Sequence, residues 1–415
     1  MTGTGAQTDR RRILGIDCGS ATLKVAVYDL GAACEQLVVE GGIERVGGSG
    51  VELRIRDQRG SQPRESQRPL GEATPIATLL GLLSELGIFV DGVGHRVVYG
   101  GSRHAGPALV TPELMTNLAA LVPFDPLHLP AALAAMREIE AALPGTAQVA
   151  CFDTAFHHRM PKVAQRLPLP RELRAEGVRR YGFHGLSYES IVRELGYAGT
   201  RGLMIVAHLG SGASLAAMRN GKPVDTTMGF SPLGGLMMGT RPGDLDPGTL
   251  LYLLRAGRYT PGELDTVLTE HSGLLGVSQI SADMRTLLEC RATDVAAAEA
   301  VELFVYEAKK HIGALVAVLG GLDTLVFTGG IGEGSAVVRS EICADLSNLG
   351  IDLDSIRNAA GEGIISDDSA HVVVRVIAAN ENLMVARHTF ATIFASSGEE
   401  SGGGAPATSA ATSAA

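Results

Sequence analysis

The chain has 415 residues, which is enough for two domains of ordinary size. Apolar residues make up 45% of the sequence, so each domain can bury a core, while 53 glycines and only 4% aromatic residues indicate an α/β protein with many tight turns. The net charge of −10, with acidic and basic residues interspersed, argues against a nucleic-acid-binding surface. An anionic ligand would need locally placed basic side chains and backbone N–H groups.

Cysteine usage and hydropathy indicate a cellular compartment. Five cysteines are scattered along the chain, with no CxxC pair and an odd total, which is typical of a reducing compartment without disulfides or a zinc site. No apolar run reaches the roughly 18 residues needed to cross a bilayer. The basic start of the chain is followed too soon by Asp17 to be a signal peptide. We therefore expect a cytoplasmic protein with no membrane partner.

The order of apolar and polar residues predicts strands that alternate with helices, the pattern of an α/β fold. We expect strands at residues 13–17, 23–29, 93–99, 148–152, 203–209, 324–328 and 371–378. We expect helices near residues 76–87, 129–142, 187–195, 247–256, 295–319, 335–347 and 381–394. The chain ends hold too little apolar surface to fold, so disordered tails are expected at 1–12 and 396–415. A polar stretch at 47–74 predicts an exposed hairpin or loop at 56–61.

A short unit occurs twice, about 190 residues apart. Residues 16–24 (IDCGSATLK) and 208–215 (HLGSGASL) each predict a strand, a Gly-Ser turn and a second strand. In the later copy the second strand ends at Asn220-Gly221, a strong signal for a type I′ hairpin turn. The repetition predicts two related domains that face each other. Coincidence between two short Gly-Ser turns is the alternative.

Three glycine-rich turns are candidate phosphate-binding sites, because consecutive backbone N–H groups can hold phosphate oxygens. They lie at residues 19–20, 210–212 and 329–334. The third follows an apolar strand and opens a helix, a context that favours nucleotide contact over a plain turn. It is not a Walker A loop, because no GK[ST] follows.

Two arginines stand in segments bounded by glycine. Arg96 lies in an apolar strand that ends at Gly100-Gly101, and Arg241 lies in a loop rich in Gly, Pro and Asp. A buried arginine usually has an anionic partner. Each is therefore either a ligand-binding group or half of an Arg–Asp salt bridge, and Asp153, at the end of a strand, is a candidate partner.

His184 and Glu381 are two further polar residues at the ends of predicted elements. His184 stands between Gly182 and Gly185 in a turn that opens a helix, where a lone histidine is more often structural than catalytic. Glu381 follows a strand and starts a helix. It is either functional or a carboxylate that the helix dipole favours at that position.

Taken together, these segments resemble the acetate kinase family, the acetokinase group of acetate, propionate and butyrate kinases. The resemblance covers roughly residues 13–395. It rests on motifs that stand in the family's order and spacing, at residues 94–98 (GHRVV), 126–128 (PLH), 152–157 (FDTAFH), 181–185 (YGFHG), 237–241 (MMGTR) and 281–285 (SADMR).

The resemblance implies an actin-like (ribonuclease H-like) duplicated two-domain α/β fold with the active site in the interdomain cleft. The first domain would span residues 13–153 and the second, nucleotide-binding domain 154–383, with a C-terminal helix at 384–395 packing back on the first domain. It also implies a homodimer that transfers the γ-phosphoryl of ATP, with Mg²⁺ and possibly Mn²⁺, reversibly to acetate, giving acetyl phosphate and ADP.

The resemblance also implies the site. The implied catalytic residues are Asp153, His184, Arg241 and Arg96, of which His184 and Arg241 would stabilise the transition state. The implied substrate-binding residues are Arg96, Val98, Leu127, Phe183 and Pro232, with His128 and His208 lining the phosphate path. The implied nucleotide-binding residues are Lys24, His208, Gly210, Ser211, Gly212, Asp283, Met284, Arg285, Gly330, Ile331 and Gly332. The implied metal ligands are Asp17 and Glu381.

The sequence departs from the family's pattern near the phosphates. Asp17 stands where the family usually has Asn, which could strengthen Mg²⁺ binding or repel phosphate. Both Ser211 and Gly334 replace Asn. The other departures are Thr22 for Ser, Tyr99 for His, Gly235 for Glu, Pro242 for Ser and Asn382 for Glu.

Three functions remain open from the sequence. The first is an acetate kinase, and the second is the same chemistry on propionate or butyrate, decided by the pocket near Val98 and Pro232. The third is a non-catalytic member that binds nucleotide as a regulatory or assembly module, which the loss of an arginine would have favoured. The sequence does not determine the acyl-chain preference, the physiological direction or the pathway partners.

Overall fold

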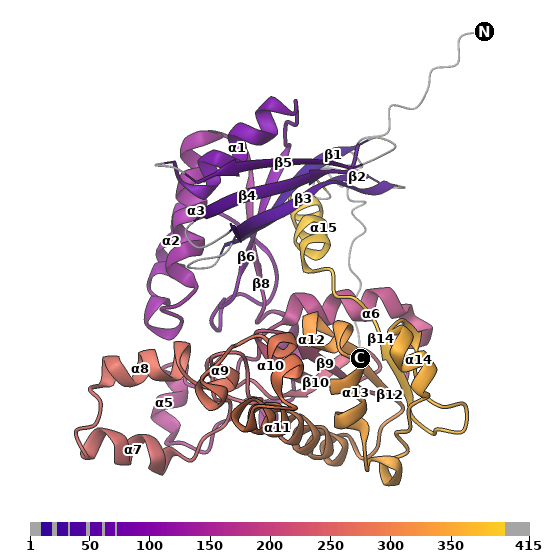
Figure 1. Ribbon diagram of the computed structural model, residues 1–415. Coiled ribbons are helices and arrows are strands. Elements are labelled where there is room, and N and C mark those ends of the chain that lie inside the picture. The colour runs from indigo at the N-terminus through magenta and orange to yellow at the C-terminus, as the bar shows by residue number, and fades with distance from the viewer. Residues whose placement is uncertain are drawn as a thin grey trace, which may run out of the picture.

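The computed structural model describes residues 10–18, 23–31, 34–46, 50–59, 63–70 and 73–394. It has two lobes, each built around one β-sheet (Figure 1). The Gly19-Ser20 turn, Thr22 and nearly all of both expected tails lie outside the described residues.

The first sheet has eight strands in the order β5-β4-β3-β2-β1-β6-β8-β7. Strands β1, β2 and β3 are antiparallel neighbours, and β6 and β8 run parallel to β1. The bounds are β1 Arg11–Cys18, β2 Leu23–Gly31, β3 Cys34–Val46, β4 Gly50–Asp57, β5 Arg64–Pro69, β6 Gly92–Val97, β7 Ala108–Leu109 and β8 Gln148–Phe152.

The second sheet has six strands in the order β11-β10-β9-β12-β14-β13. Here β9, β10 and β11 are antiparallel neighbours, and β12 and β14 continue parallel to β9. The bounds are β9 Leu203–Leu209, β10 Ala213–Arg219, β11 Lys222–Thr226, β12 Thr324–Thr328, β13 Gly363–Ile364 and β14 Val373–Val376. Five strands of each sheet therefore share one order and one set of directions, which confirms the duplicated fold.

Helices cover the sheets and connect their strands (Figure 1). The α-helices are α1 Pro75–Glu85, α2 Pro112–Ala119, α3 Leu129–Ala142, α4 Lys162–Gln165, α5 Arg171–Ala175, α6 Gly185–Gly199, α7 Pro247–Arg255, α8 Pro261–Glu270, α9 Gly273–Ser278, α10 Met284–Cys290, α11 Val295–Leu319, α12 Gly329–Gly334, α13 Ala336–Cys343, α14 Ser355–Ala360 and α15 Glu381–Phe394. Short 3-10 helices occur at η1 Val122–Phe124, η2 Phe156–Arg159 and η3 Ser347–Leu349.

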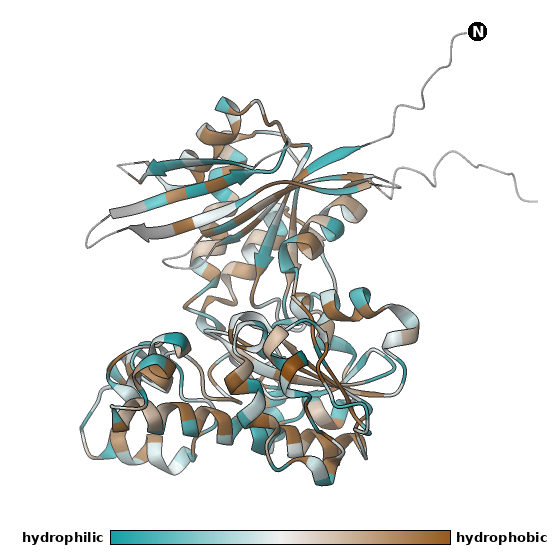
Figure 2. Cartoon of the chain, turned by 45° about the vertical axis from the view of Figure 1, so that its right-hand side comes forward, coloured by the Kyte–Doolittle hydropathy of each residue, from teal (hydrophilic) through white to brown (hydrophobic). Residues whose placement is uncertain are grey.

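The C-terminal helix α15 returns from the second lobe to the first. It packs against β1, β2, β6 and β8, and Val385 and Met384 are buried with Val149 of β8. Gly94 of β6 allows this close approach, since a Cβ there would lie 2.2 Å from Thr389 Oγ1. Hydrophobic residues lie along the strands that α15 and the other helices cover (Figure 2). The domain boundaries at 153 and 383 stay predictions.

Local sequence signals explain several turns and helix ends. The predicted hairpin turn joins β10 to β11, with Asn220 at φ 51° and Gly221 at φ 72°, as a type I′ turn requires. The long helix α11 begins after Asp294, whose side chain accepts the N–H of Ala297, and ends at Gly320 with φ 80°. These caps satisfy backbone groups that have no partner inside the helix.

Some predicted bounds differ from the structure. Strand β1 begins at Arg11, inside the expected tail 1–12, because Arg11 and Arg12 pair with Leu30 and Asp29 of β2, and the Arg12 guanidinium also bonds Asp29 at 2.7 Å. The polar stretch 47–74 holds strand β4 and the edge strand β5, which pair with each other on either side of the predicted hairpin or loop. The predicted helix at 335–347 and strand at 371–378 are shorter. In the described part of the chain no helix is long and apolar enough to cross a membrane.

Candidate active site

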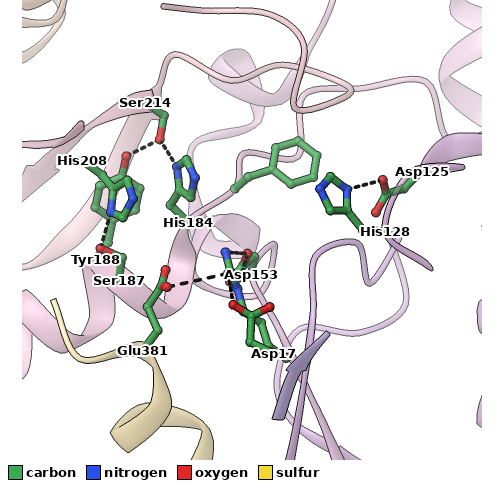
Figure 3. A network of polar contacts seen from close by, with 12 residues as sticks. Asp17, Asp125, His128, Asp153, His184, Ser187, Tyr188, His208, Ser214 and Glu381 are labelled. Carbon is green, nitrogen blue, oxygen red and sulfur yellow. Dashed lines mark hydrogen bonds and ion pairs between the residues drawn. The ribbon is translucent and has the colours of Figure 1, made fainter. Parts of the chain in front are cut away.

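Arg96, on β6, lies at the centre of three carboxylates. Its Nε and Nη2 donate to Asp153 Oδ2 at 3.1 and 2.7 Å, and its Nη1 donates to Asp17 Oδ2 at 2.8 Å. Glu381 Oε2 lies 3.7 Å from the same Nη1. Figure 3 shows the three acidic side chains, from two strand ends and the start of α15, pointing toward one another. The Arg–Asp salt bridge is therefore present at Arg96, and a substrate would meet only its remaining N–H groups.

Burial and charge act in opposite directions in this group. Burial, followed by the charges of Glu381 and Asp17, raises the pKa of Asp153 and Arg96 lowers it, with a net result of about 6. Burial lowers the pKa of Arg96, but the three carboxylates raise it well above its ordinary value. Arg96 is therefore always charged, and it neutralises much of the acidic charge around it.

His184 precedes α6 in a left-handed backbone conformation, with φ 56°. Such a conformation is uncommon for a residue other than glycine. The two flanking glycines hold it there: Gly182 has φ 75°, and a Cβ on Gly185 would lie 2.1 Å from the carbonyl oxygen of Asp153. The Gly-flanked turn therefore places the His184 ring beside the end of β8.

Two histidines, buried His184 and partly buried His208, stack beside the salt-bridge group. The rings of His184 and His208 lie 4.2 Å apart, centroid to centroid, at 19° (Figure 3). Ser214 Oγ lies 2.8 Å from His184 Nδ1 and also contacts the hydroxyl of Tyr188, while Ser187 Oγ lies 2.8 Å from His208 Nδ1. Burial, followed by His208 and both nearby arginines, lowers the pKa of His184 well below its ordinary value. The imidazole is therefore neutral at neutral pH.

Arg241 differs from Arg96 in its surroundings. Its Nη1 donates to the carbonyl of Pro232 at 2.8 Å, and among the described residues no carboxylate forms an ion pair with it. Burial lowers its pKa to about 10, which still leaves it charged at neutral pH. A Cβ on Gly212 would lie 2.8 Å from Arg241 Nη2 and 3.2 Å from His184 Nε2. Because Gly212 has no side chain, the space between the Arg241 guanidinium and His184 Nε2 stays open.

These groups line one cavity of about 520 Å³ between the two lobes. Of the predicted site residues, the cavity wall includes Asp17, Lys24, Arg96, Val98, His128, Asp153, Phe183, His184, His208, Gly210, Ser211, Gly212, Pro232, Arg241, Gly330 and Glu381. Leu127 does not line it. Met228, which the sequence did not suggest, forms part of the apolar side with Val98, Phe183 and Pro232.

A second cavity of about 480 Å³ shares Gly210, Ser211 and Gly330 with the first. It brings together the predicted residues Asp283, Met284 and Arg285, at the start of α10, with Ile331 of α12. Gly332, which is also part of α12, is buried and does not line this cavity. The predicted glycine-rich turn at residues 329–334 forms the short helix α12, and α13 follows.

Three residues that hold the glycine-rich segment 329–334 in place were not predicted from the sequence. Glu333 Oε1 accepts the N–H of Gly329 at 2.8 Å and that of Ala379 at 3.2 Å, so it joins the loop to the segment that carries Glu381. Buried Arg339 donates to the carbonyls of Gly332 and Glu333, both at 2.8 Å. Asn358 holds the Arg339 Nε at 2.8 Å. The motif contained Glu333, but its contacts depend on a segment 46 positions later.

The acidic residues of the cavity can be tested as a cation site. Glu381 Oε1 is buried and has no hydrogen-bond partner, so it could bind a cation. Asp17 Oδ2, by contrast, is already bonded to Arg96. In the described residues no group of three or more His, Cys, Asp or Glu forms a complete metal site. Mg²⁺ in phosphoryl-transfer sites commonly uses one or two carboxylates together with substrate phosphates. The residues therefore fit a cation that arrives with a nucleotide.

A duplicated α/β fold with a polar cavity between its lobes is typical of two-domain actin-like phosphotransferases. The acetokinase family profile matches residues 12–387, and the chain belongs to that family. Its members transfer a phosphoryl group to a carboxyl group. The chain is 44% identical to an acetate kinase of Rhodopseudomonas palustris, over 91% of this chain and 97% of the relative.

Two solved structures agree with this assignment. A Porphyromonas gingivalis acetate kinase is 35% identical, with a TM-score of 0.80 over 92% of this chain and 99% of that one. A Francisella tularensis propionate kinase is 33% identical, with a TM-score of 0.85 over 91% of this chain and 99% of that one. The predicted family is confirmed, as is the actin-like fold class.

Proposed function

We propose that this protein is an acetate kinase, which transfers the γ-phosphoryl of ATP reversibly to acetate and gives acetyl phosphate and ADP. The supporting observation is the cavity in which Arg241 Nη2 and His184 Nε2 lie close to Gly212, beside an apolar wall. Arg241 has no acidic partner in the described residues, so its charge is available to a bound anion. Family membership supports the same reaction.

The chemistry needs charge stabilisation and no general base. A carboxylic acid with a pKa of about 4–5 is already ionised at neutral pH. Two anions must approach each other, and phosphoryl transfer is then accelerated by preorganised donors around the transferring group. Arg241 and neutral His184 would donate to the phosphoryl oxygens. Asp153 would hold Arg96 in place, and the free N–H groups of Arg96 would face the substrate carboxylate.

The nucleotide would lie across both cavities. Its adenosine would occupy the 480 Å³ cavity between Met284 and Ile331, and its phosphates would pass Gly210 and Ser211 toward Arg241. Glu381 would hold a magnesium ion, or manganese, on its unpartnered Oε1, with Asp17 next to it. The cation would screen the phosphate charge from these carboxylates.

Propionate or butyrate kinase activity is the alternative function. The apolar wall of Val98, Met228, Phe183 and Pro232 limits how long an acyl chain can be, and one of the similar solved structures is a propionate kinase. The non-catalytic alternative fits less well, because both arginines line the cavity. The homodimer and the cytoplasmic location stay predictions.

Hydroxylamine trapping tests this function. Acyl phosphates react with hydroxylamine to give hydroxamates, which form coloured complexes with ferric iron, so the protein is incubated with ATP, magnesium and acetate, propionate or butyrate. We expect hydroxamate with acetate and a decreasing yield as the chain lengthens. A larger yield with propionate or butyrate would support the alternative, and no hydroxamate with any acid would contradict both.

A further inference from the structure

His184 has two ring nitrogens with different surroundings. Nδ1 lies 2.8 Å from Ser214 Oγ, inside the second lobe. Nε2 lies near Gly212 and Arg241 Nη2, on the cavity side. A neutral imidazole carries its proton on only one nitrogen. His184 can therefore donate to a phosphoryl oxygen only in the tautomer with the proton on Nε2.

Tyr188 determines which way the hydrogen bonds run. Its hydroxyl is fully buried and is bonded to Ser214 Oγ, the hydrogen-bond partner that the described residues offer it (Figure 3). Burial raises the pKa of Tyr188, which keeps its proton. If Tyr188 donates to Ser214, the single Ser214 proton is free to point at His184 Nδ1. Nδ1 is then an acceptor and Nε2 carries the proton.

The opposite direction leaves a buried donor without a partner. If His184 Nδ1 donated to Ser214, three donors (Nδ1–H and the Ser214 and Tyr188 hydroxyls) would share two contacts. Either the Ser214 or the Tyr188 proton would then lack an acceptor among these groups, and an unsatisfied buried donor is costly. We therefore propose that Tyr188 and Ser214 are positioning residues that fix His184 as the Nε2–H tautomer.

The neighbouring histidine provides a matched control. His208 Nδ1 lies 2.8 Å from Ser187 Oγ, the same contact that His184 makes with Ser214. No buried tyrosine is bonded to the Ser187 hydroxyl in the described residues. Removal of the Ser187 hydroxyl should therefore remove a hydrogen bond of His208 and leave the tautomer of His184 unchanged.

The test is the tautomer itself, read by long-range ¹H–¹⁵N spectra of protein labelled with ¹⁵N-histidine. The His184→Gln spectrum identifies the resonances of His184. We expect an Nε2–H pattern in the wild type and in Ser214→Thr, a mixed pattern in Ser214→Ala and Tyr188→Phe, and the wild-type pattern in Ser187→Ala. Tyr188→Phe keeps the aromatic ring, so it remains informative if Ser214→Ala does not fold.

Two results would overturn the proposal. One is an Nδ1–H pattern in the wild type, and the other is an unchanged Nε2–H pattern in both Ser214→Ala and Tyr188→Phe. The mechanistic value of the tautomer rests on the proposed function: we expect kcat at least ~10-fold lower in Ser214→Ala with little change in KM, as when a catalytic imidazole loses the partner that orients it. An inactive wild type with the expected spectra would contradict the function alone.

Discussion

Arg96 has carboxylate counter-ions and Arg241 has none among the described residues, and this difference predicts different roles. Arg96 is held by Asp153, Asp17 and Glu381, whereas Arg241 is bonded to the carbonyl of Pro232. The sequence showed that both lie in glycine-bounded segments and named Asp153 as a candidate salt-bridge partner, without indicating which arginine it would meet. A salt bridge depends on residues that are distant in the chain, so its presence at one arginine and not at the other could not be predicted.

Replacement of each arginine by alanine should separate catalysis from stability. We expect Arg241→Ala to reduce the rate by at least ~10²-fold, the usual loss for a preorganised charge donor, with little change in the free energy of unfolding. Arg96→Ala should reduce the rate and also destabilise the fold by about 3 kcal/mol or more, because it leaves buried carboxylates unpaired. Steady-state kinetics measures the rate of each variant, and urea unfolding measures its free energy of unfolding. Equal destabilisation by the two variants would contradict the distinction.

Asp17 is the residue at which this chain departs from its family next to the phosphates. Its Oδ2 is bonded to Arg96, and Asn could make the same bond with its carbonyl oxygen. We expect Asp17→Asn to raise the magnesium concentration needed for half-maximal activity, because hard cations prefer carboxylate oxygens, while the KM for acetate stays the same. The measurement is a magnesium titration of both proteins at saturating acetate. Superimposable curves would give Asp17 no part in metal binding.

At the scale of elements, strand ends and glycine turns were the sequence features from which the site could be predicted. Arg96 and Asp153 meet because β6 and β8 are parallel neighbours in the first sheet, and both line the cavity with His184 and Arg241. Tyr188 and Ser214 are ordinary residue types inside a helix and a strand, so nothing local marked them. Strands β4 and β5 were missed because they lie in a mostly polar stretch, in which β5 is polar and β4 buries only alternate residues such as Leu53 and Ile55.

Helix α15 depends on a glycine for its position against the first sheet. A Cβ on Gly94 would lie 2.2 Å from Thr389 Oγ1 and 2.6 Å from Val385 Cγ1. We expect Gly94→Ala to destabilise the protein by ~1–3 kcal/mol, the usual cost of overpacking. Gly313→Ala is the control: it has open space within α11 and should be neutral or stabilising, since alanine favours a helix. Equal melting temperatures for both variants would contradict the close approach.

At the scale of the molecule, three buried histidines make stability depend on pH. Burial lowers the pKa of His95 and His157 to about 4 and that of His184 well below its ordinary value. In the unfolded chain a histidine binds a proton near pH 6.5. From there down to about pH 4 the unfolded chain binds more protons, so the free energy of unfolding falls as the pH falls. Asp153 opposes this, because its folded pKa is raised.

Urea unfolding at pH 7, 6 and 5 measures this dependence. We expect the free energy of unfolding to be lower at pH 5 than at pH 7 by on the order of 2 kcal/mol for each buried histidine. The raised pKa of Asp153 offsets part of this loss. His95→Gln should flatten the curve, and replacement of the exposed His371 by Gln should leave it unchanged. A free energy of unfolding that does not change between pH 7 and 5 would show that these histidines are not held neutral.

The central claim is that the cleft transfers a phosphoryl group from nucleotide to a small carboxylate, and ³¹P NMR tests it most directly. Protein, ATP, magnesium and acetate are combined, and the γ-phosphoryl signal is followed with time. We predict a new acyl phosphate resonance that grows as ADP forms, and that grows at least ~10²-fold more slowly with Arg241→Ala. Release of inorganic phosphate alone, or ATP that stays intact, would contradict the account.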